Sequence, residues 1–246
     1  MAEKIYECQI CKDSGFVMKV MEDGYEYATP CKCREIKIAK DRLKRSGLAK
    51  EFTDKSFENY VTGDNAQLID AKKTAERFAN SIDEGNVNEA HSLLLCGQVG
   101  AGKTHLGTAC SMSLINKGIA VIYMGYREEM TSIKSKILDE DAYSKEINKF
   151  KNAPVLFIDD FLKGRITESD VNVIYEIVNY RYNNKLPVII STEKTLDELI
   201  NFDEAIASRL IEMCTGYIVV FTGKEWVCQV KCVSSFLHLF PQLSAV

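Results

Sequence analysis

The chain has 246 residues, of which 46% are hydrophobic, and a formal net charge of −4 at pH 7. That length suits one sizeable α/β domain with a small appendage, and the acidic balance argues against general coating of nucleic acid, although a local basic patch is compatible with it. No run approaches the roughly 18 to 20 apolar residues that span a bilayer, and the start of the chain lacks a signal-peptide core, so we expect a cytoplasmic protein with no membrane partner.

Four of the nine cysteines lie near the start of the chain, at Cys8, Cys11, Cys31 and Cys33. Between the two pairs, alternating segments at 16–20 and 25–29 flank a turn and predict a β-hairpin. The hairpin would bring both pairs to its open end, where four thiolates could bind one structural zinc ion in tetrahedral geometry. Four unliganded thiols, or a redox pair, are the alternatives.

Residues 34–47 follow a helical pattern with many basic side chains, and Gly47 suits the end of that helix. The basic face could meet DNA phosphates, an acidic partner surface or only solvent. Residues 48–62 show no clear period and read as a linker, which separates a module at 1–47 from a larger domain at 63–224. A helix from 64 or 65 to about 80 opens that domain.

Residues 97–104 fit the pattern G-x-x-x-x-G-K-[ST], between an apolar run at 92–96 and a helical pattern at 104–117. In this context the backbone would curl so that its N–H groups point at the phosphates of ATP. Lys103 would reach the β- and γ-phosphates, and Thr104 would place its hydroxyl on Mg²⁺. The plain alternative is a glycine-rich turn. The residues predicted to bind the nucleotide here are Gly97, Gln98, Val99, Gly100, Ala101, Gly102, Lys103 and Thr104.

The rest of the domain alternates apolar runs with helical patterns. Four more strands are predicted at 119–124, 155–160, 188–192 and 217–221, with helices at 126–138, from 167, from 195 and at 203–213, and a passage rich in lysine and acid at 139–152. Strands that are apolar on both faces belong to a parallel sheet covered by helices. The sequence therefore predicts an α/β fold, a doubly wound five-stranded P-loop sheet with its ligand at the carboxyl ends of the strands.

Asp159 and Asp160 end one of these strands, at the sheet edge where the phosphate loop is also expected. One carboxylate could hold Mg²⁺ alongside Thr104, and the other could orient or deprotonate the attacking water. Two solvated strand-end acids are the alternative. Arg209, on a predicted helix, is either a surface arginine or a finger that reaches the γ-phosphate of a neighbouring subunit.

Four stretches, 97–106, 155–160, 178–182 and 207–212, together resemble the DnaC/DnaI-type helicase loaders of the AAA+ class, and the likeness extends to about residue 224. The resemblance adds His105 to the nucleotide loop, assigns Asp159 to Mg²⁺ and makes Asp160 the hydrolytic carboxylate. It also makes Arg209 the arginine finger, which implies a self-oligomer. The cysteine module resembles the zinc-bearing domain with which such loaders grip the helicase.

The function that this resemblance implies is ATP-dependent loading of a replicative hexameric DNA helicase onto single-stranded DNA. Two alternatives stay open: an ATPase helper of a transposase of the IstB-like kind, which shares the core motifs, and a nucleotide-gated zinc adaptor without turnover. The turnover of an Asp160→Asn variant would separate the adaptor from the enzymes.

The chain departs from the family pattern in two places. The fourth strand of the domain ends in Ser191-Thr192-Glu193 where the family commonly has Thr-Ser-Asn, so a carboxylate replaces the amide that senses the γ-phosphate. Residues 225–246 do not resemble the family's basic ending. For this tail, disorder, a crossing strand and an altered reading frame are all open.

Overall fold

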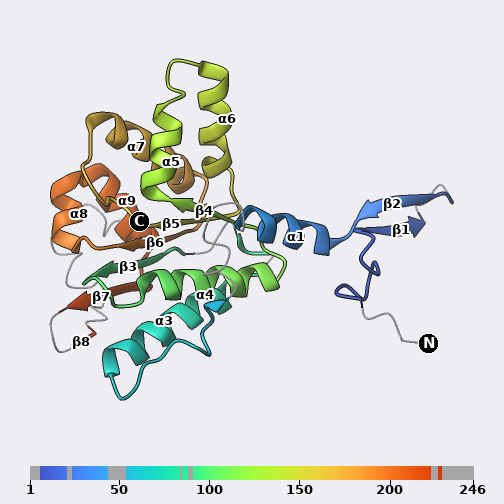
Figure 1. The fold of residues 1–246 in the computed structure, drawn as a ribbon, viewed down its shortest axis with the longest axis horizontal. Helices are drawn as coiled ribbons and strands as arrows, with labels where there is room; N and C mark the ends of the chain where they lie inside the picture. Colours follow the sequence, from blue (N-terminus) through green and yellow to red (C-terminus); the bar gives the residue numbers. More distant parts are fainter. Residues whose placement is uncertain are drawn as a thin grey trace, which may run out of the picture.

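The computed structural model describes residues 6–20, 24–43, 54–83, 85–87, 91–222 and 227–228 (Figure 1). Near the start of the chain, strands β1 (Phe16–Val20) and β2 (Glu26–Pro30) pair antiparallel as the predicted hairpin. Helix α1 (Lys32–Leu43) follows and packs against β4 and α4, with Ile36 half-buried on the core. Figure 1 shows the hairpin projecting away from the main domain at the far end of α1.

The predicted five-stranded parallel sheet is confirmed. Its strands lie in the order β4-β5-β6-β3-β7. They are β3 (Leu93–Gly97), β4 (Val121–Gly125), β5 (Val155–Asp159), β6 (Val188–Thr192) and β7 (Ile218–Thr222). A sixth strand, β8 (Val227–Cys228), pairs antiparallel with β7, so these two residues of the tail add an edge strand. The rest of the tail lies outside the described residues.

Helices cover both faces of the sheet, because alternate residues of each strand point to opposite cores. On β3, Leu93 and Leu95 face one core, and Leu94 and Cys96 face the other. The first core is closed by α3 (Ala66–Ser81) and α4 (Lys103–Asn116). The second is closed by α5 (Tyr126–Lys134), α6 (Glu140–Lys151), α7 (Glu168–Asn183), α8 (Leu196–Phe202) and α9 (Glu204–Met213).

The region after β4 differs from the prediction. The helix expected at 126–138 ends at Lys134, and the passage at 139–152, left without an element, contains α6. Asp139 caps this helix by accepting a hydrogen bond of 3.0 Å from the Ala142 N–H. Within α6 only Ile147 and Phe150 are buried. Its own apolar pattern is therefore too sparse to indicate a helix.

Arg181 is buried in the core and links the segments that lead into β5 and β6. Its side chain is fully buried, and its guanidinium donates to the carbonyls of Phe150 at 2.9 Å, Ala153 at 2.8 Å and Pro187 at 2.6 Å. Burial lowers the pKa of Arg181 to about 9. This arginine, part of the family-like stretch at 178–182, ties the α6–β5 and α7–β6 connections together.

Strands β3 and β6 are neighbours, and the connections that leave them run toward opposite edges of the sheet, from β3 to β4 and from β6 to β7. In open α/β sheets such a switch point, at the carboxyl ends of the strands, is where ligands bind. The ends of β3, β6 and β5 are consecutive neighbours there. In the part of the chain that the structure describes, no helix is long and apolar enough to cross a bilayer.

Candidate nucleotide site and metal centre

The phosphate loop turns sharply between β3 and α4. Gly97, Gly100 and Gly102 have positive φ angles of 106°, 80° and 77°, a region that side chains disfavour. A Cβ at Gly97 would lie 2.2 Å from the Phe221 carbonyl oxygen. The N-cap residue of α4 is Gly102, which has no side chain to cap the helix, so the first N–H groups of α4 are placed to bind an anion such as phosphate.

Lys103 lies folded over the loop. Its side chain is buried, and Nζ donates to the carbonyls of Gly97 at 2.9 Å and Gln98 at 2.6 Å. Burial lowers the pKa of Lys103, while the negative charge of Glu193 opposes that shift. The ammonium therefore lies in the loop, within electrostatic range of the acids at the strand ends.

Asp159 is a buried carboxylate at the end of β5 and accepts three hydroxyl hydrogen bonds. Thr104 donates at 2.9 Å and Ser191 donates to the same oxygen, while Tyr123 donates at 3.2 Å to the other. Burial raises the pKa of Asp159, and the bonds from Ser191 and Thr104 oppose that rise. A buried carboxylate beside a threonine hydroxyl is a donor set that suits Mg²⁺, so Thr104 and Asp159 fit their predicted role.

Asp160 follows in a left-handed conformation with φ 55°. Its N–H donates to Ser191 Oγ at 3.0 Å, which ties the turn to the end of β6. The carboxylate is half-exposed and pairs with Lys163 at 3.0 Å, and Lys163 also pairs with Glu193 at 3.1 Å. The structure therefore brings Glu193, the residue at the departure from the family pattern, into the same cluster as Asp160.

The predicted linker lies against the loop. Tyr60 is buried, donates through its hydroxyl to the Ala101 carbonyl at 3.0 Å and stacks edge-on with His105. His105 Nε2 lies 2.9 Å from the Ser56 carbonyl oxygen and 3.0 Å from Asn59 Oδ1. The His105 ring thus contacts this segment, and its predicted contact with nucleotide stays a prediction.

Arg209 lies on α9, where α9 packs against α7. Its Nε donates to Asn179 Oδ1 at 3.0 Å and one terminal nitrogen donates to the Ala205 carbonyl at 2.7 Å. The guanidinium also lies over the rings of Tyr175 and Tyr182, 5.3 and 5.7 Å from their centroids. These contacts fix its direction, and its action on a neighbouring subunit stays a prediction.

The four early cysteines converge as the hairpin prediction requires. Their Sγ atoms lie within 4.8 Å of one another, with Cys8 3.8 Å from Cys31 and Cys11 3.2 Å from Cys33. All four are free thiols. Zinc at about 2.3 Å from each sulfur would separate the sulfurs by about 3.8 Å, so the cluster fits zinc. The hollow around it, about 630 Å³, extends to Asn116 at the end of α4.

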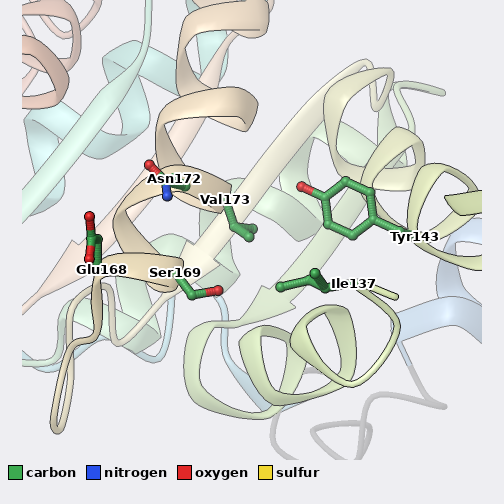
Figure 2. Close-up of a pocket in the computed structure, with 6 residues that line it drawn as sticks. All are labelled: Ile137, Tyr143, Glu168, Ser169, Asn172 and Val173. Carbon is green, nitrogen blue, oxygen red and sulfur yellow. The ribbon is translucent and has the colours of Figure 1, made fainter. Parts of the chain in front are cut away.

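A separate pocket of about 380 Å³ lies between the α5–α6 connection and the start of α7 (Figure 2). Figure 2 shows Ile137 and Tyr143 on one side of it and Val173 on the other. The full lining is Ile137, Tyr143, Glu168, Ser169, Asn172 and Val173. These residues include none of the predicted site residues, so this pocket is distinct from the nucleotide site.

Sequence reasoning missed four residues that build the nucleotide site. Ser191 and Tyr123 contact Asp159, Lys163 contacts Asp160, and Tyr60 contacts the loop. Ser191 and Tyr123 lie on strands whose carboxyl ends were expected at this edge, so polar side chains there were a usable signal. Lys163 and Tyr60 belong to irregular segments, where spacing alone predicts no contact.

The chain is similar to proteins of DNA replication. The bacterial DnaA ATPase domain family matches residues 50–216. The phage-like element PBSX protein XkdC of Bacillus subtilis (strain 168) is 33% identical over 228 residues, which cover 90% of this chain and 84% of XkdC.

Two solved structures have the same fold. The DnaC helicase loader aligns with a TM-score of 0.57 and 26% identity, covering 70% of this chain and 98% of DnaC. DnaI aligns with a TM-score of 0.58 and 21% identity, covering 72% of this chain and 93% of DnaI. With the sheet order, the phosphate loop and the strand-end aspartates, these matches confirm the resemblance noted in the sequence. The chain belongs to the bacterial DnaA ATPase-domain family of AAA+ proteins, and it resembles the DnaC/DnaI type among solved structures.

Proposed function

We propose that this protein is an ATPase that loads a replicative hexameric DNA helicase onto single-stranded DNA in the cytoplasm. The observation that carries the proposal is the bond between Tyr60 and the Ala101 carbonyl, with His105 joined to Ser56 and Asn59. The segment that follows the cysteine module thus lies on the phosphate loop. Nucleotide in that loop would act directly on the connection to the module.

The residues at the strand ends support ATP hydrolysis as the reaction. Water attacks the γ-phosphorus, the bond to the bridging oxygen breaks, and ADP leaves with that electron pair. Asp160 is the carboxylate that accepts the proton from the water. Lys103 and the amides of α4 bind the phosphates, and Thr104 and Asp159 hold Mg²⁺. When bound, Mg²⁺ neutralises charge on the β- and γ-phosphate oxygens.

The hairpin supports binding of a protein partner. Phe16, Met18 and Val20 alternate on β1 and so share one face, and they are 43%, 57% and 67% exposed. Exposed apolar side chains gathered on one face are typical of a docking surface. In this proposal that face binds the helicase, and the zinc ion at Cys8, Cys11, Cys31 and Cys33 holds the hairpin in shape.

The test uses the full-length chain and the replicative helicase of the cell that carries the gene. Met18→Asp, on the apolar face, is expected to lose helicase binding in a pull-down and to keep its zinc. Lys19→Asp is the matched control, because Lys19 lies on the opposite face of the same strand. Equal retention of helicase by wild type and Met18→Asp would contradict the proposal.

A second measurement tests the control by nucleotide. Helicase affinity of the wild type is expected to differ between ATP and ADP, and Tyr60→Phe, which removes the bond to Ala101, is expected to reduce that difference. ATP-dependent filaments on duplex DNA without helicase contact would instead indicate a transposase helper. Near-zero turnover in wild type with DNA and helicase present would indicate an adaptor.

A further inference from the structure

Lys163 lies between two carboxylates at the edge of the nucleotide site. Its Nζ is 3.0 Å from Asp160 Oδ2 and 3.1 Å from Glu193 Oε1. These hydrogen bonds raise the pKa of Lys163, and the one with Asp160 has the larger effect. The lysine therefore carries a full positive charge. Asp160 follows Asp159, whose carboxylate accepts a hydrogen bond from the hydroxyl of Thr104 at the end of the phosphate loop. The cluster therefore belongs to the surroundings of the phosphates.

A rigid turn places Lys163 there. Phe161 and Leu162 are each 1% exposed and anchor the turn in the core. Phe161 N–H donates to the Ser191 carbonyl at 2.8 Å, and Thr192 donates to the Phe161 carbonyl at 2.7 Å. The Lys163 N–H closes the turn on the Asp160 carbonyl at 3.0 Å. The lysine side chain itself is 46% exposed, so its ammonium is free to change partners while its backbone stays fixed.

The charges around Lys163 indicate a role for it when ATP is bound. Two carboxylates near a triphosphate repel it, and one ammonium between them offsets part of that repulsion. A terminal phosphate carries more negative charge than one carboxylate and competes for the same cation. Glu193 lies on the other side of the ammonium and can keep hold of it. Asp160 is the partner that would be released, and the proposed hydrolysis needs this carboxylate without a cation attached.

We propose that Lys163 is a catalytic residue of the ATPase reaction, whose ammonium moves from Asp160 to an oxygen of the γ-phosphate while Glu193 retains it. This inference rests on the proposed ATPase function. It has two consequences. Lys163 makes ATP bind more tightly than ADP, because ADP has no γ-phosphate. It also frees Asp160 to accept the proton of the attacking water when ATP, and not ADP, is bound.

The experiment measures binding and turnover in the full-length chain. Affinities for ADP and for an ATP analogue that resists hydrolysis are obtained by fluorescence titration. Lys163→Ala is expected to weaken binding of the ATP analogue by about 10- to 100-fold, the effect of losing one charge-assisted hydrogen bond, with ADP affinity nearly unchanged. Turnover is expected to fall by about 100-fold. Lys163→Arg is expected to keep most of the preference for ATP.

Two further variants make the result specific. Lys194→Ala is the matched control, because Lys194 is a partly exposed lysine next to Glu193 that pairs with Glu198 at 3.7 Å. Its affinities for ADP and for the ATP analogue are both expected to equal those of the wild type. In the double variant Lys163→Ala/Glu193→Gln, the loss of preference for ATP is expected to persist. Restoration of preference and turnover there would mean that Lys163 only neutralises Glu193, and would overturn the inference.

The outcomes separate this inference from the function on which it rests. A wild type that hydrolyses ATP, with a Lys163→Ala variant equal to it in turnover and in nucleotide preference, overturns the inference and leaves the proposed function standing. A wild type that binds neither nucleotide overturns the proposed function and the inference together. Thermal unfolding of each variant confirms folding, which a half-exposed lysine is not expected to control.

Discussion

The Thr104 hydroxyl donates a hydrogen bond of 2.9 Å to Oδ1 of Asp159, although 55 residues separate the two in the chain. The bond joins the start of α4 to the end of β5 across the intervening strand β6. Ser191, from the end of β6, donates to the same oxygen. Two strand ends and the start of a helix therefore meet at one carboxylate, and the position at which Mg²⁺ is expected is defined by residues from all three elements.

Asp160→Asn is expected to abolish turnover and to preserve ATP binding. The amide cannot accept a proton from water, and loss of a general base costs about 10²- to 10⁴-fold in rate. The half-exposed ion pair with Lys163 contributes little to the stability of the fold, so its loss should leave the variant folded. Steady-state phosphate release and nucleotide titration measure both effects, with the exposed Asp141→Asn as control. Turnover equal to wild type would exclude Asp160 as the base.

Purified protein is expected to contain one zinc ion per chain, bound at the cysteine cluster. Cys11→Ser should remove the metal, because three thiolates and a hydroxyl bind zinc more weakly than four thiolates. Elemental analysis gives the stoichiometry, and limited proteolysis reports cleavage within the hairpin. Cys110→Ser, at a buried cysteine of α4, serves as control and should keep one zinc ion. Equal zinc content in Cys11→Ser and wild type would place the metal elsewhere.

Arg209 is expected to act on the site of a neighbouring subunit. Arg209→Ala and Asp160→Asn should each be nearly inactive, since an arginine finger contributes about 10³- to 10⁵-fold to turnover. A mixture of the two should exceed both, because the Asp160→Asn subunit supplies Arg209 to an intact site. Phosphate release measured across mixing ratios checks this. A mixture that matches the average of the separate variants would show that Arg209 does not act between subunits.

Asp170 is expected to contribute stability that is lost in acid. Its carboxylate is buried, pairs with Lys134 at 2.7 Å and accepts the Thr167 N–H at 2.7 Å in a capping box. Burial opposes the shift, but the bonds from Lys134 and Thr167 lower the pKa of Asp170 below its ordinary value of 3.8. The folded state therefore binds this proton less tightly than the unfolded state. Its stabilisation is complete above pH 3.8 and falls as the pH drops through the lower folded value.

Asp170→Asn should accordingly reduce the free energy of unfolding at pH 7 by about 1 to 2 kcal/mol, since one charged acceptor is lost. The difference between variant and wild type should shrink in acid, as the wild-type carboxyl becomes protonated. Urea unfolding from pH 7 down to pH 3 measures both effects. Asp197→Asn, at an exposed position on α8, should change stability far less. A difference that stays constant with pH would contradict the assignment.

Several elements could be predicted because their signals are local. The alternation at 16–20 and 25–29 indicates a hairpin, and the continuous apolar runs at 155–159 and 188–192 indicate strands buried on both faces. The glycine pattern before Lys103 indicates a phosphate loop through backbone conformation alone. Helix α6 was missed because only two of its side chains, Ile147 and Phe150, are buried, and its sequence is dominated by charge.

The order of the strands and the partners of each site residue required the tertiary structure. Lys163 and Glu193 are 30 residues apart in the sequence and belong to different connections, yet they form an ion pair of 3.1 Å. Tyr60 lies in a segment without a period and contacts the phosphate loop. Contacts of this kind depend on how the ends of separate strands are juxtaposed.

From its amino-acid sequence alone, this protein could be assigned a P-loop sheet, a four-cysteine module and the chemical types of the side chains that serve each. Periodicity and backbone propensity act over a few neighbouring residues, so a sequence pattern records them directly. Which carboxylate meets which hydroxyl, and where Lys163 and Tyr60 lie, was decided by packing of the two cores around the sheet. Packing depends on contacts between distant residues, and those contacts exist only once the chain has folded.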